Sequence, residues 1–136
     1  MTKQYLQQYL WCVQEQKRLE SRIAAVREEM EGIRSIIVSD MPKGGGRDNE
    51  RLEKLIDLKQ DLINEYHEQI KQGHIVMTNI ETALHTIRNP KIRSVISMRF
   101  LDGYSFRRIA ENMQMSERNV YRLCCIGIYI LEKQDG

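Results

Sequence analysis

The residues best suited to chemistry lie close together near the carboxyl end of the chain, between positions 107 and 122. Most of their side chains donate hydrogen bonds or carry positive charge, and these are the groups that recognise nucleic acid. An arginine can make two hydrogen bonds to the edge of a guanine, and an asparagine can do the same for an adenine. The candidate DNA-contacting residues are Arg107, Arg108, Ser116, Glu117, Arg118, Asn119, Tyr121 and Arg122.

These candidates divide into two sets by the part of the DNA that they suit. Arg118 and Arg122 have the spacing of one helix face and suit base edges in the major groove, while Tyr121 suits a phosphate or a thymine methyl group. Arg107 and Arg108 precede them and suit the phosphate backbone, which positions a protein without reading sequence. We therefore expect one base-reading helix and one supporting helix.

Two serines mark where these helices begin. Ser105 and Ser116 can each accept a hydrogen bond from a backbone amide in the first turn that follows, as an N-cap residue does. The small side chain of Ala110 allows two helices to cross closely, and Val120 and Leu123 supply the inner face of the second helix. This spacing is typical of a helix-turn-helix, whose second helix enters the major groove.

A further helix precedes this pair. Pro90 suits a first helical turn, so we expect a helix over 90–101 that ends near a left-handed Gly103. Arg99 lies near its end and suits either a phosphate or an internal ion pair with Glu111. The predicted core positions of this helix are Ile92, Val95, Ile96 and Phe100.

About the last 45 residues resemble the DNA-binding region 4 of bacterial sigma factors of the major class. The matching positions are Asn89-Pro90, Val95, Met98, Arg99-Phe100, Asp102-Gly103, Ser105, Ile109-Ala110, Met115-Ser116 and Val120. The resemblance implies that Ser116 through Arg122 read the upstream hexamer of a promoter. Taken with its long helical amino half, the whole chain is similar to phage-encoded late transcription regulators that carry such a domain.

The chain departs from the sigma pattern at several positions. Arg108 stands where glutamate is usual, and Gln114 occupies a turn position usually held by glycine. Leu123 and Ile126 replace residues that are commonly arginine, and the helix from Leu123 to Leu131 is apolar nearly all round. Such a helix must be buried, so we expect its far end to pack on the amino-terminal helices or on a second subunit.

The first 88 residues predict a long antiparallel helical hairpin of the coiled-coil type. Apolar residues recur at steps of four and three in both halves, which favours helices packed lengthwise. We expect helices over about 3–38 and 49–88, capped at Asp48 or Asn49, with a Gly-rich loop over 39–48 between them. The pattern leaves open whether 49–88 is one helix or two broken at Gly73. The first stripe is Leu19, Ile23, Val26, Met30, Ile33 and Ile37; the second is Leu52, Ile56, Lys59, Ile63, Tyr66, Ile70, Gly73, Met77, Ile80, Leu84 and Ile87.

The predicted fold is therefore all-α, with a hairpin domain over 1–88 followed by a three-helix helix-turn-helix domain over 89–136. A two-helix hairpin buries only one stripe per helix, so we expect this part to form homo-oligomers or to pack against the C-terminal domain. The net charge of +2 is uneven, because residues 88–136 hold nine Lys and Arg against five Asp and Glu. The positive excess thus lies where phosphates would be met.

The sequence gives no indication of a catalytic or metal-binding site. Three cysteines and three histidines lack metal-ligand spacing, and no cofactor loop or catalytic grouping is present, so we expect no enzyme, cofactor or metal. Without an apolar run of membrane-spanning length or a signal peptide, we expect a cytoplasmic protein, in the bacterial host if phage-encoded.

These patterns favour a sequence-specific DNA-binding transcription regulator. The resemblance to phage late regulators implies, more narrowly, a phage late-gene activator that acts with host bacterial RNA polymerase. Two alternatives stay open. One is a viral DNA-packaging subunit of the small-terminase type, in which the helix-turn-helix recognises the packaging site and the coiled segment builds a ring. The other is a coiled-coil interaction protein whose helix-turn-helix does not bind DNA.

Overall fold

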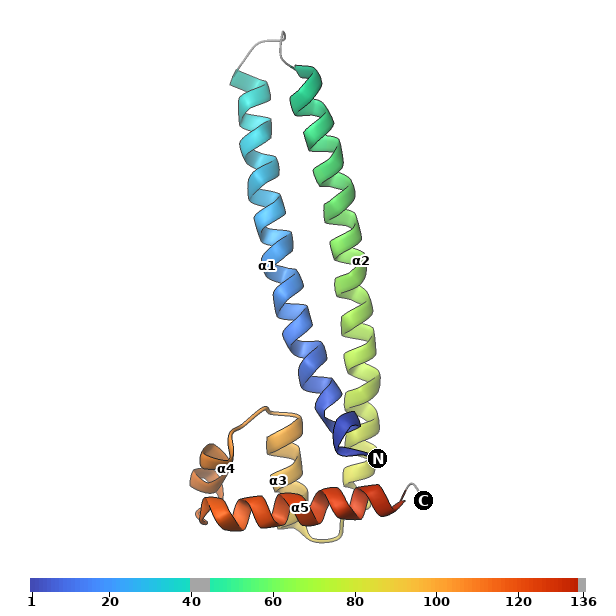
Figure 1. Cartoon of the computed structure of the whole chain (residues 1–136), viewed down its shortest axis with the longest axis vertical. Coiled ribbons are helices and arrows are strands. Elements are labelled where there is room, and N and C mark those ends of the chain that lie inside the picture. The colour runs from blue at the N-terminus through green and yellow to red at the C-terminus, as the bar shows by residue number, and fades with distance from the viewer. Residues whose placement is uncertain (40–44, 135–136) are drawn as a thin grey trace. The chain divides into compact units, whose positions relative to one another are not determined.

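The computed structural model describes residues 1–39 and 45–134, and in that part of the chain all regular structure is helical (Figure 1). The elements are α1 (Lys3–Ser39), α2 (Gly45–Leu84), α3 (Pro90–Phe100), α4 (Phe106–Met113) and α5 (Glu117–Gln134). The predicted all-α class is confirmed. The chain forms two compact units: Gln14–Ile70, and Met1–Val13 together with Lys71–Gly136.

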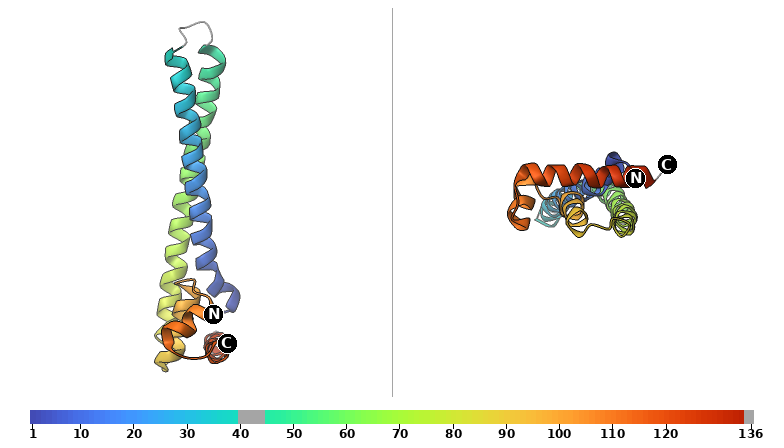
Figure 2. Two further views of the ribbon diagram at one scale, coloured as in Figure 1. Left: turned by 90° about the vertical axis from the view of Figure 1, so that its left-hand side faces the viewer. Right: turned by 90° about the horizontal axis from the view of Figure 1, so that it is seen from below.

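The unit Gln14–Ile70 is an antiparallel pair of helical segments, from α1 and α2, that lie side by side (Figures 1 and 2). The stripe predicted on α1 is confirmed for five of its six residues, because Leu19, Ile23, Val26, Met30 and Ile33 are buried, whereas Ile37 is half-buried. Polar contacts join the two segments as well: the Tyr66 hydroxyl donates to Glu20 Oε1 at 2.6 Å.

The stripe predicted on α2 is partly wrong, because some of the buried residues precede the predicted ones by one position. Ile56 and Ile70 are 44% and 40% exposed, whereas Leu62, outside the predicted stripe, is only 3% exposed. Between Leu52 and Tyr66 lie two adjacent apolar pairs, Leu55-Ile56 and Leu62-Ile63. A stripe through either member of each pair keeps steps of three and four. Spacing alone does not determine which stripe faces α1.

The helix α2 is continuous from Gly45 to Leu84, so the open question about Gly73 is answered in favour of one helix. It begins before the predicted start at 49 and ends before the predicted end at 88. Asp48 and Asn49 therefore lie inside its first turns instead of capping it, and Asp48 contributes a negative charge near the positive end of the helix dipole. Residues 40–44 of the predicted loop lie outside the described residues.

The second unit has one core to which every one of its segments contributes. The ends of α1 and α2 supply Leu6 and Ile80, both fully buried, and α5 supplies Leu131 at 1% exposure. The apolar far end of α5 thus packs on the amino-terminal helices, which confirms the first of the two alternatives predicted for it. The core residues predicted for α3, Ile92, Val95, Ile96 and Phe100, are all buried.

Local signals set the ends of α3 as the sequence predicts. The Asn89 side chain accepts a hydrogen bond from the Lys91 amide at 2.9 Å, and Pro90 is the first helical residue. The helix ends at Phe100, and Gly103 follows with φ of +75°. Among the described helices, none combines the length and apolar character needed to cross a membrane.

Candidate nucleic-acid interface

The helices α4 and α5 form the predicted helix-turn-helix. Ser105 Oγ accepts from the Arg108 amide at 3.2 Å and Ser116 Oγ accepts from the Asn119 amide at 3.1 Å, so both predicted N-caps are confirmed. The inner faces meet through fully buried Ile109 and Val120. The Ser116 hydroxyl, a predicted DNA contact, is already used in starting α5.

The turn between these helices depends on a left-handed residue that is not glycine. Gln114 has φ of 54° and ψ of 50°, and its amide donates to the carbonyl oxygens of Ala110 and Glu111. The Met115 amide also donates to Ala110 O, at 3.1 Å. The left-handed conformation costs a residue with a side chain about 1–2 kcal/mol. The turn therefore lowers the stability of the folded protein compared with a glycine at this position.

The outer face of α5 presents the predicted base-reading side chains. Glu117, Arg118 and Arg122 are exposed, and Arg118 makes no ion pair or hydrogen bond with the residues that the structure describes. Arg122 instead donates from Nε and Nη2 to Asn119 Oδ1, at 3.2 and 2.7 Å. Asn119 is half-buried and differs from its neighbours, because both ends of its amide are bonded within the chain.

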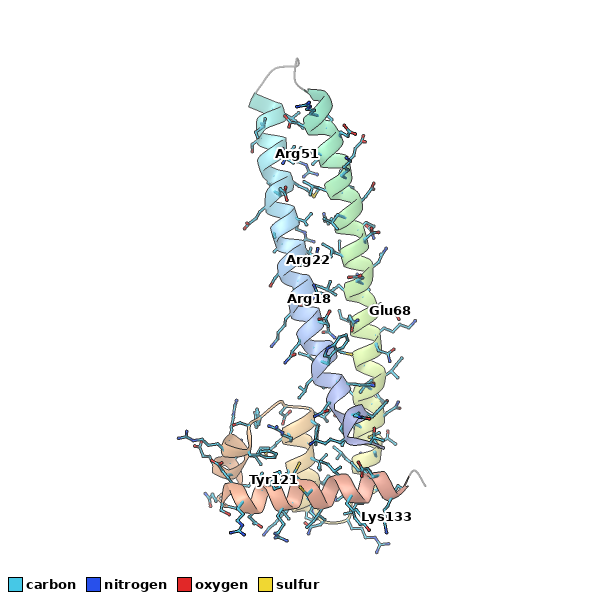
Figure 3. All side chains as sticks on the ribbon, in the orientation of Figure 1. Arg18, Arg22, Arg51, Glu68, Tyr121 and Lys133 are labelled. Atoms are coloured by element: carbon cyan, nitrogen blue, oxygen red, sulfur yellow. The ribbon has the colours of Figure 1, made fainter. Side chains whose placement is uncertain are left out.

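Tyr121 lies on the same helix and is 59% exposed (Figure 3). One edge of the ring packs against Phe106 of α4, with ring centroids 5.6 Å apart and planes at 81°. A hydrogen bond with the Cys125 thiol is the largest cause that raises the pKa of the Tyr121 hydroxyl. A tyrosine hydroxyl is protonated at neutral pH in any case, and the raised pKa of Tyr121 further favours this form, which can donate to an anion.

The two arginines of α4 are exposed but differ in their surroundings. Arg107 Nε lies 3.5 Å from Glu111 Oε1 in an exposed pair, which contributes well under about 1 kcal/mol in water. Arg108 lies over the Tyr104 ring, 3.8 Å from its centroid. Arg107, Ser116 and Glu117 line one open hollow at the turn, together with Ala110, Glu111, Gln114 and Met115.

Arg99 makes no ion pair with Glu111, so that predicted alternative is wrong. Its guanidinium lies 4.2 Å from the centre of the Phe106 ring, and Nη1 donates to the Tyr104 carbonyl at 3.1 Å. Since Arg99 is half-buried at the end of α3, the nearby ring and carbonyl hold it there. Glu111 pairs with Arg107 instead.

Sequence reasoning missed Tyr104, Phe106 and Met115, which orient the predicted contact residues. Tyr104 supports Arg108, Phe106 supports Tyr121, and Met115 Sδ accepts from Asn119 Nδ2 at 3.4 Å. Aromatic residues on both sides of the Ser105 cap were a visible signal for the first two. The role of Met115 could be recognised only from the geometry of the turn between α4 and α5.

The thiols and imidazoles form no second site in the described part of the chain, where no group of three or more His, Cys, Asp or Glu could hold a metal ion. Cys12 and Cys124 are buried and Cys125 is exposed. Burial raises the pKa of the Cys12 thiol and is the largest cause that raises that of Cys124. Both buried cysteines are therefore protonated packing residues near neutral pH.

Comparison with protein families matches residues 89–123 to the model described as Sigma-70, region 4. Comparison with curated proteins and with solved structures gave no match. The family match begins at the N-cap of α3 and ends within α5, after Arg122, so it contains every predicted DNA-contacting residue. Residues 89–123 are therefore a sigma-70 region 4 helix-turn-helix domain.

Proposed function

We propose that this protein is a sequence-specific DNA-binding transcription regulator, a phage late-gene activator that acts with bacterial RNA polymerase. The observation that carries the proposal is the outer face of α5, where Arg118, Tyr121 and Arg122 are exposed on the second helix of a region 4 helix-turn-helix. Such a helix enters the major groove with its first turns against base edges.

The charges around this face support the same proposal. Arg107 and Arg108 lie on the supporting helix, where side chains commonly meet phosphates. Arg108 is held on the Tyr104 ring, so less of its conformational freedom is lost when an anion binds. Bacterial RNA polymerase is the partner that a sigma-like domain implies.

The test is DNA binding by the full chain and by an Arg118→Ala/Arg122→Ala variant. DNA fragments from the source genome are first selected with wild-type protein, and affinities for the selected fragments are then measured. Each bidentate arginine–guanine pair contributes about 1–3 kcal/mol, so the double variant should bind at least about thirtyfold more weakly. An Arg22→Ala/Arg27→Ala variant is the matched control, because it removes the same charge from exposed positions of α1.

The outcomes separate this proposal from the alternatives. Fragments that lie beside promoters, with the loss confined to the α5 variant, support a regulator. Fragments that lie at a packaging start, together with a stable protein ring, would favour the packaging subunit. Equal affinity of wild-type protein and the α5 variant for the same DNA would favour an interaction protein that does not bind DNA through this helix.

We also propose that the protein forms homo-oligomers through the unit Gln14–Ile70. Ile56 and Ile70 are more than one-third exposed, and half-buried Ile63 lies midway between them. The interval of seven residues places all three on one side of α2. A second helix could therefore cover this side without displacing α1.

A further inference from the structure

Asn119 and Arg122 form the best-defined polar contact on the outer face of α5. Two donors of Arg122, Nε and Nη2, point at one oxygen, Asn119 Oδ1, at 3.2 and 2.7 Å. Hydrogen bonds from a charged donor are about twice as strong as those between neutral groups. The pair therefore favours one direction of the exposed guanidinium in the absence of DNA.

The other end of the Asn119 amide is also used. Nδ2 donates to Met115 Sδ at 3.4 Å, and Met115 packs against the core of the helix-turn-helix. If the amide were turned over, its NH2 group would face the donors of Arg122. The network therefore permits only the orientation in which the oxygen meets the guanidinium.

This arrangement limits what each residue can read. Bidentate recognition of adenine needs both the oxygen and the NH2 group of asparagine. Arg122 Nε and Nη2 already donate to Asn119 Oδ1, which has two lone pairs, so that oxygen has none left for adenine. An arginine has five N–H donors, and Arg122 retains both protons of Nη1 and the second proton of Nη2. That end of the guanidinium is sufficient for the O6 and N7 atoms of guanine.

We propose that Asn119 is a positioning residue that presents Arg122 to a guanine, and that Asn119 does not itself read adenine. This inference rests on the proposed function and goes further by naming the base that this part of α5 prefers. It predicts that removing Asn119 and removing Arg122 change the preference at the same base pair.

The experiment selects binding sites from random DNA with the full chain in four forms: wild type, Arg122→Ala, Asn119→Ala and Asn119→Asp. Arg122→Ala should lower the preference for one guanine by about tenfold to a hundredfold. Asn119→Ala should lower the preference for that guanine by about three- to tenfold, because Arg122 is no longer directed. Asn119→Asp should retain it, since a carboxylate oxygen accepts the same two bonds from Arg122.

The aspartate variant is decisive because its carboxylate cannot donate to adenine N7. If Asn119 reads adenine directly, Asn119→Ala and Asn119→Asp will both lose an adenine position and leave the guanine unchanged, which overturns the inference. Failure of Asn119→Asp to retain the guanine preference overturns it as well. Base preference is a ratio of affinities, so it does not depend on the folded fraction of a variant. A wild-type protein without any base preference would instead contradict the proposed function itself.

Discussion

At the scale of single residues, Gln114 shows a conflict between side chain and backbone. Its φ of 54° lies in the left-handed region, where a Cβ atom is crowded. Its amide nevertheless makes the hydrogen bonds that end α4. The turn geometry is thus imposed by the packing of α4 on α5 and not by the preference of this residue.

We expect Gln114→Gly to raise the free energy of unfolding by about 0.5–1 kcal/mol. Relief of the left-handed strain outweighs the greater entropy of glycine in the unfolded chain. Urea denaturation followed by circular dichroism measures the change. Gln114→Ala is the control, because it keeps the Cβ atom and should not stabilise; a stabilised alanine variant would show that the effect comes from the lost amide and not from backbone strain.

At the scale of elements, the packing of α3 on α5 requires a glycine within a helix. A Cβ atom at Gly127 would lie 2.6 Å from Ile96 Cγ1 and 3.0 Å from Ile92 Cγ2. A glycine inside a helix costs about 1 kcal/mol relative to alanine. The close approach of the two helices offsets that cost, since it lets the isoleucines pack directly on the α5 backbone.

We expect Gly127→Ala to destabilise the protein by about 1–3 kcal/mol, because overpacking outweighs the better helix propensity. Thermal unfolding measures the loss. Ile96→Ala makes room for the new methyl group, so the double variant Gly127→Ala/Ile96→Ala should be less destabilised than the two single changes together. Strict additivity would contradict this account, as would a stabilised Gly127→Ala protein.

Elements whose signals are local were predictable from sequence, and those that depend on distant partners were not. The caps at Asn89, Ser105 and Ser116 each need only residues two or three positions away. The buried flank of α2 and the contact at Gly127 depend on which helix lies opposite, which spacing does not encode. In the site, the residue types were visible in the sequence, while the bonding of Asn119 to Arg122 and Met115 required the three-dimensional structure.

At the scale of the whole molecule, the region 4 segment and the first residues of the chain share one core. Leu6 of α1 is fully buried in the same cluster as Ile109 and Val120 of the helix-turn-helix. Residues 89–136 alone would lack that contribution and those of Ile80 and Leu84 from α2. The boundary predicted between residues 88 and 89 stays a prediction. The burial indicates that DNA binding should be measured on the full chain.

The self-association proposed for the unit Gln14–Ile70 also belongs to this scale. A two-fold interface uses the same surface of both copies, so each substitution removes an apolar side chain from both sides of the interface. Full burial of one isoleucine side chain stabilises the buried state by about 1.5–3 kcal/mol. Ile56→Ser/Ile70→Ser should therefore weaken association at least about tenfold in sedimentation equilibrium. The control Leu58→Ser/Val38→Ser changes two other exposed apolar residues and should leave association unchanged. A wild-type protein that sediments as a compact monomer at micromolar concentration would contradict this mode of assembly. The exposed isoleucines of α2 would then remain in contact with solvent.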